Sequence, residues 1–153
     1  MDLTNMETKQ TNFDKGKEGE EFVAEALSQK GFKVIHVGGA VKYSKDGGRF
    51  FCSDLLPYRK GKIFWVQVKN KEPRKYYPDT GLERWRFDNL KFHQKETGRP
   101  VLLLFTDISK KIYGDWIDNL RDDKHPAMEN KKDNIEMIYF WLADLKDLNK
   151  LFS

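Results

Sequence analysis

The side chains in this sequence best suited to a chemical reaction are those of Asp54, Gln67 and Lys69. Asp54 lies on the first arm of a predicted β-hairpin, whose turn covers residues 59–62, and the other two lie on the second arm. Cleavage of a phosphodiester bond needs an activated water and a charge partner for the oxygens around phosphorus. A Mg²⁺ ion held by carboxylates can supply both, so metal-assisted cleavage would explain polar groups in so apolar a segment.

The second arm of this hairpin has two chemically different faces. Because side chains alternate along a strand, the even positions form an apolar face, consisting of Phe64, Val66 and Val68. The odd positions share the opposite face, consisting of Trp65, Gln67 and Lys69. The amide and the ammonium group are therefore expected on one side of the strand, next to Asp54. In a less specific interpretation they form the solvated face of an antiparallel strand, and Asp54 makes a local hydrogen bond.

The order of these residues resembles that of the PD-(D/E)xK nuclease superfamily. In this superfamily an Asp precedes a β-strand with a three-residue motif, which consists of an Asp, Glu or Gln, then any residue, then a Lys. Twelve residues separate Asp54 from Gln67 here. Members include type II and Mrr-like restriction endonucleases and the archaeal-type Holliday-junction resolvases. The resemblance implies an α/β fold with a restriction-endonuclease-like core, a central mixed β-sheet flanked by helices.

The resemblance extends beyond the hairpin, over roughly residues 15–106. Upstream it includes a helical segment with the pattern Gly16-x-x-Gly19-Glu20, and downstream it includes the apolar segment 98–105. The order of a helix with a glutamate, a hairpin with the three polar residues, a second helix and an apolar strand is more specific than any one piece.

The resemblance also implies a role for each polar residue. Asp54 would be the bridging ligand of a Mg²⁺ ion, for which Mn²⁺ could substitute. Gln67 would contribute its amide oxygen, Val68 its main-chain carbonyl, and Glu20 a further carboxylate, which suits an ion that prefers hard oxygen ligands. Lys69 would orient the attacking water and stabilise developing negative charge. Gln67 departs from the commoner acid at its position, although Mrr-like relatives also carry Gln there.

The chain is predicted to consist of a disordered tail over residues 1–13 and a single nuclease-like domain over 14–153. A helix is expected over 15–29, with Gly16 and Gly19 in its apolar stripe and therefore packed closely against a sheet. Glu20 lies at the edge of that stripe, so it is the carboxylate of this helix best placed to reach the site, or else a solvated carboxylate near the positive helix end.

The remaining elements follow from hydrophobic periodicity and from Gly and Pro positions. Strands are expected over 32–37, 101–105, 111–117 and 135–142, helices over 86–97 and 144–152, and loops over 70–84 and 120–134. The 101–105 strand is uninterrupted in its apolar character and should be buried on both faces.

A set of basic residues follows the candidate site and is predicted to contact the phosphates of nucleic acid. It consists of Lys71, Arg74, Lys75, Arg84, Arg86 and Lys91. Tyr76, Tyr77 and Trp85 are interleaved with them and would either stack on a distorted base or pack beneath the loop. Lys91 and Gln94, one turn apart, are candidates for facing the scissile phosphate.

Composition allows nucleic-acid binding without identifying it. The 153 residues carry a formal net charge of +4 and one cysteine, so an intramolecular disulfide and a cysteine-based zinc site are excluded. No apolar run is long enough for a membrane helix and no signal peptide is recognised, so the cytoplasm, or a host cytoplasm for a phage-encoded protein, is expected.

The function that these observations favour is a metal-dependent DNA endonuclease, structure-selective in the manner of a Holliday-junction resolvase and acting on branched or distorted duplex as a homodimer. The alternatives are a restriction- or repair-type endonuclease, or a catalytically inactive nucleic-acid-binding module of the same fold.

Overall fold

The computed structural model describes residues 12–37, 41–43, 49–51, 53–120, 128–130 and 135–152. Residues 1–11 of the expected tail therefore lie outside the described residues, as do 121–127 and 131–134 of the expected 120–134 loop. The last two residues of the expected tail are helical, because α2 begins at Asn12.

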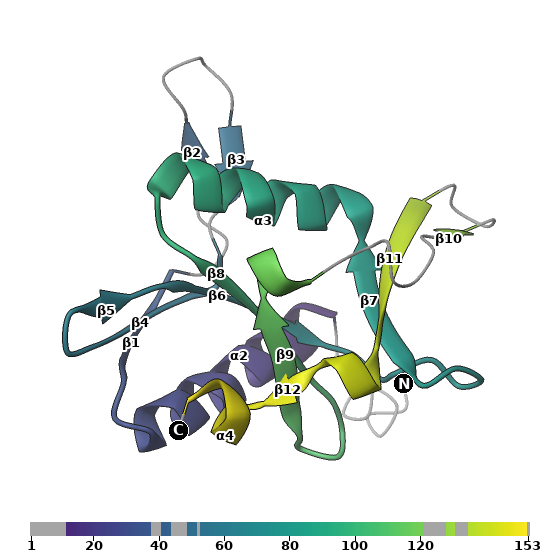
Figure 1. The fold of residues 1–153 in the computed structure, drawn as a ribbon, viewed down its shortest axis with the longest axis horizontal. Helices are drawn as coiled ribbons and strands as arrows, with labels where there is room; N and C mark the ends of the chain where they lie inside the picture. The colour runs from purple at the N-terminus through teal and green to yellow at the C-terminus, as the bar shows by residue number, and fades with distance from the viewer. Residues whose placement is uncertain are drawn as a thin grey trace, which may run out of the picture.

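A seven-stranded mixed sheet forms the centre of the molecule (Figure 1). Its strands run in the order β1-β4-β6-β8-β9-β12, with β5 pairing to β4 at one side. They are β1 (Lys33–His36), β4 (Leu55–Arg59), β5 (Lys62–Ile63), β6 (Trp65–Asn70), β8 (Val101–Thr106), β9 (Ile112–Trp116) and β12 (Lys146–Asp147). Among the described strands of this sheet, β6 and β8 pair in parallel and the others pair antiparallel, which gives the mixed sheet expected from the sequence.

The two central strands confirm the predicted face assignments. Phe64, Val66 and Val68 pack into a core on one face of the sheet. Every residue of β8 is buried, with Leu102 and Leu104 on that face and its remaining apolar side chains on the other. The second face of β6 is not fully solvated, because Trp65 packs against the other core.

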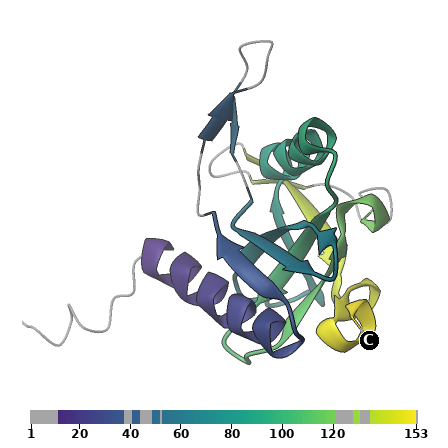
Figure 2. The ribbon, with the colours of Figure 1, turned by 90° about the vertical axis from the view of Figure 1, so that its left-hand side faces the viewer.

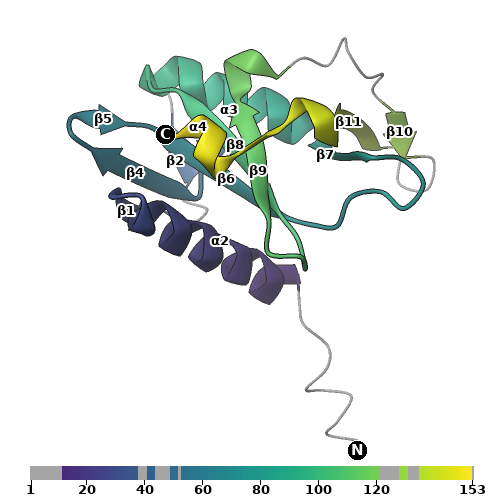
Figure 3. The ribbon, with the colours of Figure 1, turned by 60° about the horizontal axis from the view of Figure 1, so that its bottom comes forward.

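Helices cover both faces of the main sheet. Helix α2 (Asn12–Gln29) lies on one face, where its Val23 and Leu27 are buried, together with the short helix α4 (Leu148–Leu151). Helix α3 (Arg84–Thr97) lies on the opposite face (Figures 2 and 3) and buries Phe87 and Leu90 there. The fold is therefore α/β, with a central mixed sheet between helical layers, as predicted. Among the described residues, no helix has the length and hydrophobicity needed to cross a membrane.

A second, three-stranded sheet was not predicted. Its strands run in the order β10-β11-β7 and cover Met128–Asn130, Ile135–Trp141 and Asp79–Glu83. The expected loops 70–84 and 120–134 are thus wrong in part. Strand β7 contains Asp and Gly, which are depleted in strands, and it forms by pairing with β11 more than 50 positions away in the sequence. A Cβ at Gly81 would collide with the main chain of Ile138, so glycine permits this close approach.

The C-terminal segment also differs from the prediction of one helix over 144–152. A 3₁₀ turn (Leu142–Asp144), the two-residue strand β12 and the single-turn helix α4 replace it. Asp147 ends the strand and caps α4 by accepting a hydrogen bond from the main-chain N–H of Lys150. Pairing of β12 with β9 extends the sheet by one strand, and tertiary pairing of this kind overrides a short helical pattern.

The N-terminal half of α2 is seated on the end of β6. Asn70 at that end donates a hydrogen bond of 2.9 Å from its side-chain amide to the main-chain oxygen of Lys15. A Cβ added at Gly19 would lie 2.7 Å from the Cβ of Asn70, whereas one at Gly16 would meet no heavy atom within 4 Å outside its own helix. The predicted close packing is therefore confirmed at Gly19 and wrong at Gly16.

Alanine substitutions at these two glycines should have opposite effects. Gly16→Ala is expected to raise the free energy of unfolding by up to about 1 kcal/mol, because alanine favours the helix and no atom obstructs it. Gly19→Ala is expected to lower it by about 1–2 kcal/mol, since the methyl group forces α2 away from Asn70. Denaturant unfolding measures both, and stabilisation by both substitutions would contradict this seating of α2.

Candidate active site

The hairpin brings Asp54 next to the middle of β6. Lys60 and Gly61, both with positive φ, form the two-residue turn at which β4 meets β5, a backbone geometry that suits a tight hairpin. Leu55 pairs with Val66 across the antiparallel β4–β6 ladder. This register places Asp54, the residue immediately before β4, opposite Gln67. The turn therefore fixes the separation of the aspartate and the amide.

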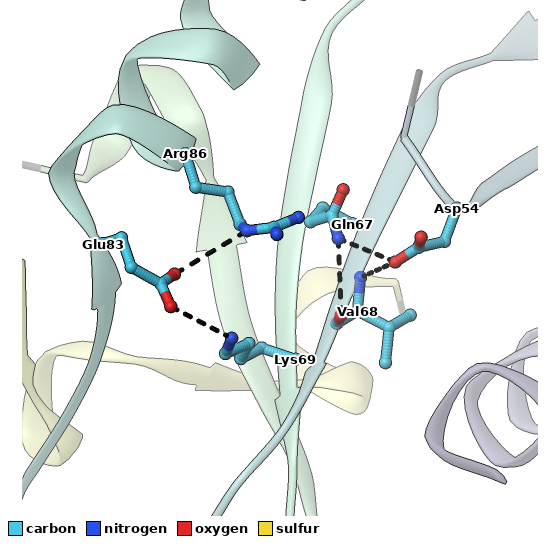
Figure 4. A network of polar contacts seen from close by, with 6 residues as sticks. All are labelled: Asp54, Gln67, Val68, Lys69, Glu83 and Arg86. Atoms are coloured by element: carbon cyan, nitrogen blue, oxygen red, sulfur yellow. Dashed lines mark hydrogen bonds and ion pairs between the residues drawn. The ribbon is translucent and has the colours of Figure 1, made fainter. Parts of the chain in front are cut away.

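Asp54 accepts two hydrogen bonds from the second arm (Figure 4). Its Oδ2 atom accepts from the side-chain Nε2 of Gln67 at 2.8 Å and from the main-chain N–H of Val68 at 2.9 Å. Gln67 is buried, with 7% of its surface exposed, so it does not lie on a fully solvated strand face. Asp54 does make hydrogen bonds to the neighbouring strand, as the less specific interpretation expected. In this arrangement the amide of Gln67 presents its nitrogen to Asp54 and its oxygen points away (Figure 4).

Glu20 reaches the same aspartate from α2. The two carboxyl groups are close enough for each to influence the protonation of the other. Burial, together with the negative charge of Asp54, raises the pKa of Glu20 to about 7. Burial also raises the pKa of Asp54, against the hydrogen bond from Val68 and the charges of Arg86 and Lys69. Two neighbouring carboxyl groups with raised pKa values hold a proton near neutral pH, and a divalent cation could take its place.

Lys69 and Arg86 lie on the other side of the pocket and share one carboxylate. The Nζ atom of Lys69 lies 3.7 Å from Oε1 of Glu83, and Nε of Arg86 lies 3.7 Å from Oε2 of the same side chain (Figure 4). Burial favours the neutral form of Glu83, but a hydrogen bond from its own main chain and the charges of Lys69 and Arg86 lower its pKa below the usual range. Glu83 is therefore an anion between two cations.

These groups line one open pocket of about 490 Å³. Besides the residues named above, Lys15 and Lys71 line it, and burial with the nearby Lys69 lowers the pKa of Lys71. Within the described ranges, no three or more His, Cys, Asp and Glu side chains are close enough together to hold a metal ion. A cation here would therefore depend on two carboxylates supplemented by the Gln67 amide and the Val68 carbonyl.

The structure brings only part of the predicted basic set to this pocket. Lys71 and Arg86 line it. Arg74 instead forms a two-point ion pair with the fully buried Asp79, and Arg84 hydrogen bonds to Glu136 at 2.6 Å. Lys75 lies 5.5 Å from the ring centre of Tyr76, and Lys91 lies 4.7 Å from that of Phe87.

Gln94 also does not line the pocket. Its side-chain oxygen accepts a hydrogen bond from the main-chain N–H of Val101, and its nitrogen donates to Asp118. Gln94 therefore anchors α3 to the start of β8, and the idea that it faces a scissile phosphate is wrong for this arrangement.

The three aromatic residues of the basic segment have different surroundings. The ring of Tyr77 packs on the guanidinium group of Arg74, 4.6 Å away, and Trp85 packs in the same way on Arg86 at 4.7 Å. Tyr76 is 82% exposed and Trp85 is 52% exposed. Tyr77 is 53% exposed as well. None of the three rings is therefore packed beneath the loop, and stacking on a distorted base stays a prediction.

Sequence reasoning missed two charged residues of the pocket, Glu83 and Lys15. Glu83 lies at the junction of β7 and α3, inside a segment predicted to be a loop. No periodicity or spacing relates it to Lys69. Lys15 falls at the predicted start of α2, and only the direction of that helix across the end of β6 brings it to the site.

The mixed sheet and its flanking helices have the restriction-endonuclease-like nuclease fold. Two solved structures share it. One is a Holliday junction resolvase from the archaeal hyperthermophile Archaeoglobus fulgidus, with a TM-score of 0.62, 12% sequence identity, and coverage of 90% of this chain and 94% of that one. The other is a nuclease from a fusselovirus, with a TM-score of 0.56, 14% identity, and coverage of 94% and 90%.

At these identities the similarity shows a common fold and leaves the chemistry to be argued from the site. No protein-family model matches the sequence, and no curated protein matches it.

Proposed function

We propose that this protein is a divalent-metal-dependent endonuclease that hydrolyses phosphodiester bonds of DNA. The observation that carries the proposal is the convergence of Glu20, Asp54, Gln67 and Lys69 in one pocket from a helix and two strands. The pocket has the hairpin geometry of a fold shared with a resolvase and a viral nuclease.

The donor groups of the pocket fit a Mg²⁺ or Mn²⁺ ion. Glu20 and Asp54 offer two carboxylates whose pKa values are raised chiefly by burial, and in Glu20 also by the negative charge of Asp54. The main-chain carbonyl of Val68 adds a hard oxygen ligand, and rotation of the Gln67 amide would add another. Such an ion would supply an activated water and charge stabilisation at phosphorus.

The remaining groups act on the water and the phosphate. In the reaction, the water oxygen bonds to phosphorus, the bond from phosphorus to one bridging oxygen breaks, and that oxygen takes up a proton. The ammonium group of Lys69, in the same pocket as the two carboxylates, would hold the attacking water and stabilise the extra negative charge on the phosphate oxygens. Asp54 and Glu20 must both be deprotonated to bind the cation, which favours activity at neutral to alkaline pH.

The substrate class that we favour is branched or distorted duplex DNA. We expect a homodimer to recognise its structure and cleave it. The resolvase with the same fold is named for its action on Holliday junctions. Two copies related by a two-fold axis would present two sites to symmetric strands. A restriction- or repair-type activity is the alternative enzyme, and a catalytically silent DNA-binding module is the alternative from another class.

One assay separates these possibilities. The protein is incubated with a four-way junction, a linear duplex and a single strand, each with Mg²⁺, with Mn²⁺ or with EDTA. We expect symmetric nicking of the junction with either metal and no cleavage with EDTA. Equal cleavage of linear duplex would favour the restriction- or repair-type enzyme. Binding without cleavage under every metal condition would favour the silent module and contradict the proposal.

A further inference from the structure

Arg86 differs from the other arginines of this region in how its guanidinium group is held. Arg74 and Arg84 make hydrogen-bonded ion pairs with Asp79 and Glu136 at 2.7 and 2.6 Å. Arg86 lies 3.7 Å from Glu83, which is too long for a hydrogen bond. Its Nε atom is buried and has no hydrogen-bond partner among the described residues.

The guanidinium group of Arg86 is nevertheless held in a defined direction. It stacks on the ring of Trp85, 4.7 Å from the ring centre, a contact that restrains an arginine without using its donors. Figure 4 shows it extending from the first turn of α3 toward Gln67. The positive charge of Arg86 lowers the pKa of Asp54 more than the positive charge of Lys69 does. Arg86 is thus close to the reacting centre with donors available.

Glu83 is placed to control both cations at once. Its Oε1 atom faces Lys69 and its Oε2 atom faces Arg86, each at 3.7 Å. The Oε2 atom is buried and, like Nε of Arg86, has no hydrogen-bond partner among the described residues. Because no hydrogen bond joins these two charged atoms, the guanidinium group can turn toward an anion in the pocket without breaking one, which a saturated structural ion pair would not allow.

We propose that Arg86 is a catalytic residue that binds a non-bridging oxygen of the scissile phosphate. Glu83 is then a positioning residue that holds Arg86 and Lys69 apart, on opposite sides of its own carboxylate. The inference rests on the proposed nuclease function and assigns a second cationic group to the same site. Arginine suits this role because its planar fork of donors matches a phosphate and its charge does not titrate.

Measuring the cleavage rate at saturating DNA separates this role from a peripheral contact. Arg86→Ala and Arg86→Gln are expected to reduce the single-turnover rate about 10²-fold, with little change in the dissociation constant for the junction. If Arg86 made only a peripheral phosphate contact, these substitutions would instead weaken DNA binding and reduce its salt dependence. The cleavage rate at saturating DNA would then be unchanged. Arg99→Ala, at an exposed arginine just after α3, is the matched control and should behave as the wild type.

Glu83→Gln tests the positioning role. This substitution keeps the shape of the side chain and removes its charge, and we expect the saturated rate to fall about tenfold, in the range typical of groups that support a reacting residue. The effect should be smaller in an Arg86→Ala background, because one of the two cations that Glu83 positions is then absent. Glu96→Gln, at an exposed glutamate of α3, is the control.

The outcomes distinguish this inference from the proposed function. If the wild type cleaves DNA and both folded Arg86 variants cleave at the wild-type rate, the inference is overturned while the nuclease assignment stands. An undiminished effect of Glu83→Gln in the Arg86→Ala background would overturn the positioning role. If the wild type cleaves none of the DNA substrates, the proposed function itself fails. Melting temperatures of the variants without DNA identify any loss of rate that comes from unfolding.

Discussion

Replacing Asp54 by asparagine is expected to reduce the rate of DNA cleavage about 10³-fold. The substitution removes a carboxylate that would hold the cation, and the transition state thereby loses several kcal/mol of charge stabilisation. Asparagine keeps an oxygen at the end of the side chain, so the hydrogen bond from the main-chain N–H of Val68 can remain. Alanine would leave that partly buried N–H unpaired, at a cost of about 1–3 kcal/mol in stability. Asparagine therefore separates chemistry from folding better than alanine.

Single-turnover cleavage of the preferred DNA substrate, together with a binding measurement in EDTA, checks this prediction. Binding should be retained in the Asp54→Asn variant, because the carboxylate repels phosphate. Lys69→Ala should lose cleavage similarly. Asp88→Asn, at an exposed position on α3, serves as the charge-matched control and should cleave normally. Cleavage by Asp54→Asn at the wild-type rate would show that the site is assigned to the wrong residues.

Replacing Glu20 by glutamine is expected to stabilise the metal-free protein at alkaline pH. The pKa of Glu20 is raised to about 7 in the folded protein, whereas an unfolded chain gives the ordinary value near 4.5. The folded state therefore binds this proton more tightly. The charged form destabilises the fold increasingly as pH rises from about 4.5, and the effect is complete above about pH 7. After allowing for solvent screening of a half-exposed carboxyl, we expect a gain of about 1 kcal/mol for Glu20→Gln.

Unfolding free energies as a function of pH, with and without Mg²⁺, measure this effect. Without metal, the difference between Glu20→Gln and the wild type should be near zero at about pH 4.5 and largest near pH 8. With Mg²⁺ at the higher pH the order should reverse, because the wild type gains the free energy of binding the ion. Glu25→Gln, at an exposed position farther along α2, should show neither effect. A pH-independent difference would contradict the carboxyl pair.

The parts of the site that lie close together in the sequence were predictable. The turn at Lys60 and Gly61 fixes the register of the hairpin, and side-chain alternation then decides which groups share a face with Gln67. Both are local properties. The continuous apolar run of β8 likewise predicted a strand buried on both faces. The start of α3 was predicted to within two residues.

Glu20 was predictable for a different reason. Helical periodicity placed it at the edge of the apolar stripe of α2, and a glycine one residue before it allowed the helix to approach β6. The resemblance to a known superfamily supplied the expectation that a carboxylate from this helix completes the site. Periodicity alone gave equal support to a solvated glutamate.

The half of the pocket that contains Glu83 and Arg86 could not be predicted in the same way. Glu83 ends a strand whose partner, β11, follows it by more than 50 residues, and such non-local pairings leave no short-range pattern. Arg86 looked like any other member of a basic segment. Arg74 and Arg84 are hydrogen-bonded to Asp79 and Glu136, whereas Arg86 faces Glu83, which lines the pocket.

The most direct test of the site is to locate a bound cation by paramagnetic broadening of backbone amide resonances during titration with Mn²⁺. We predict that substoichiometric Mn²⁺ broadens the signals of Asp54, Gln67 and Val68 first, followed by those of α2 around Glu20, and that Asp54→Asn abolishes this selectivity. Broadening centred elsewhere in the protein, or unchanged in the Asp54→Asn variant, would contradict a metal site formed by these residues.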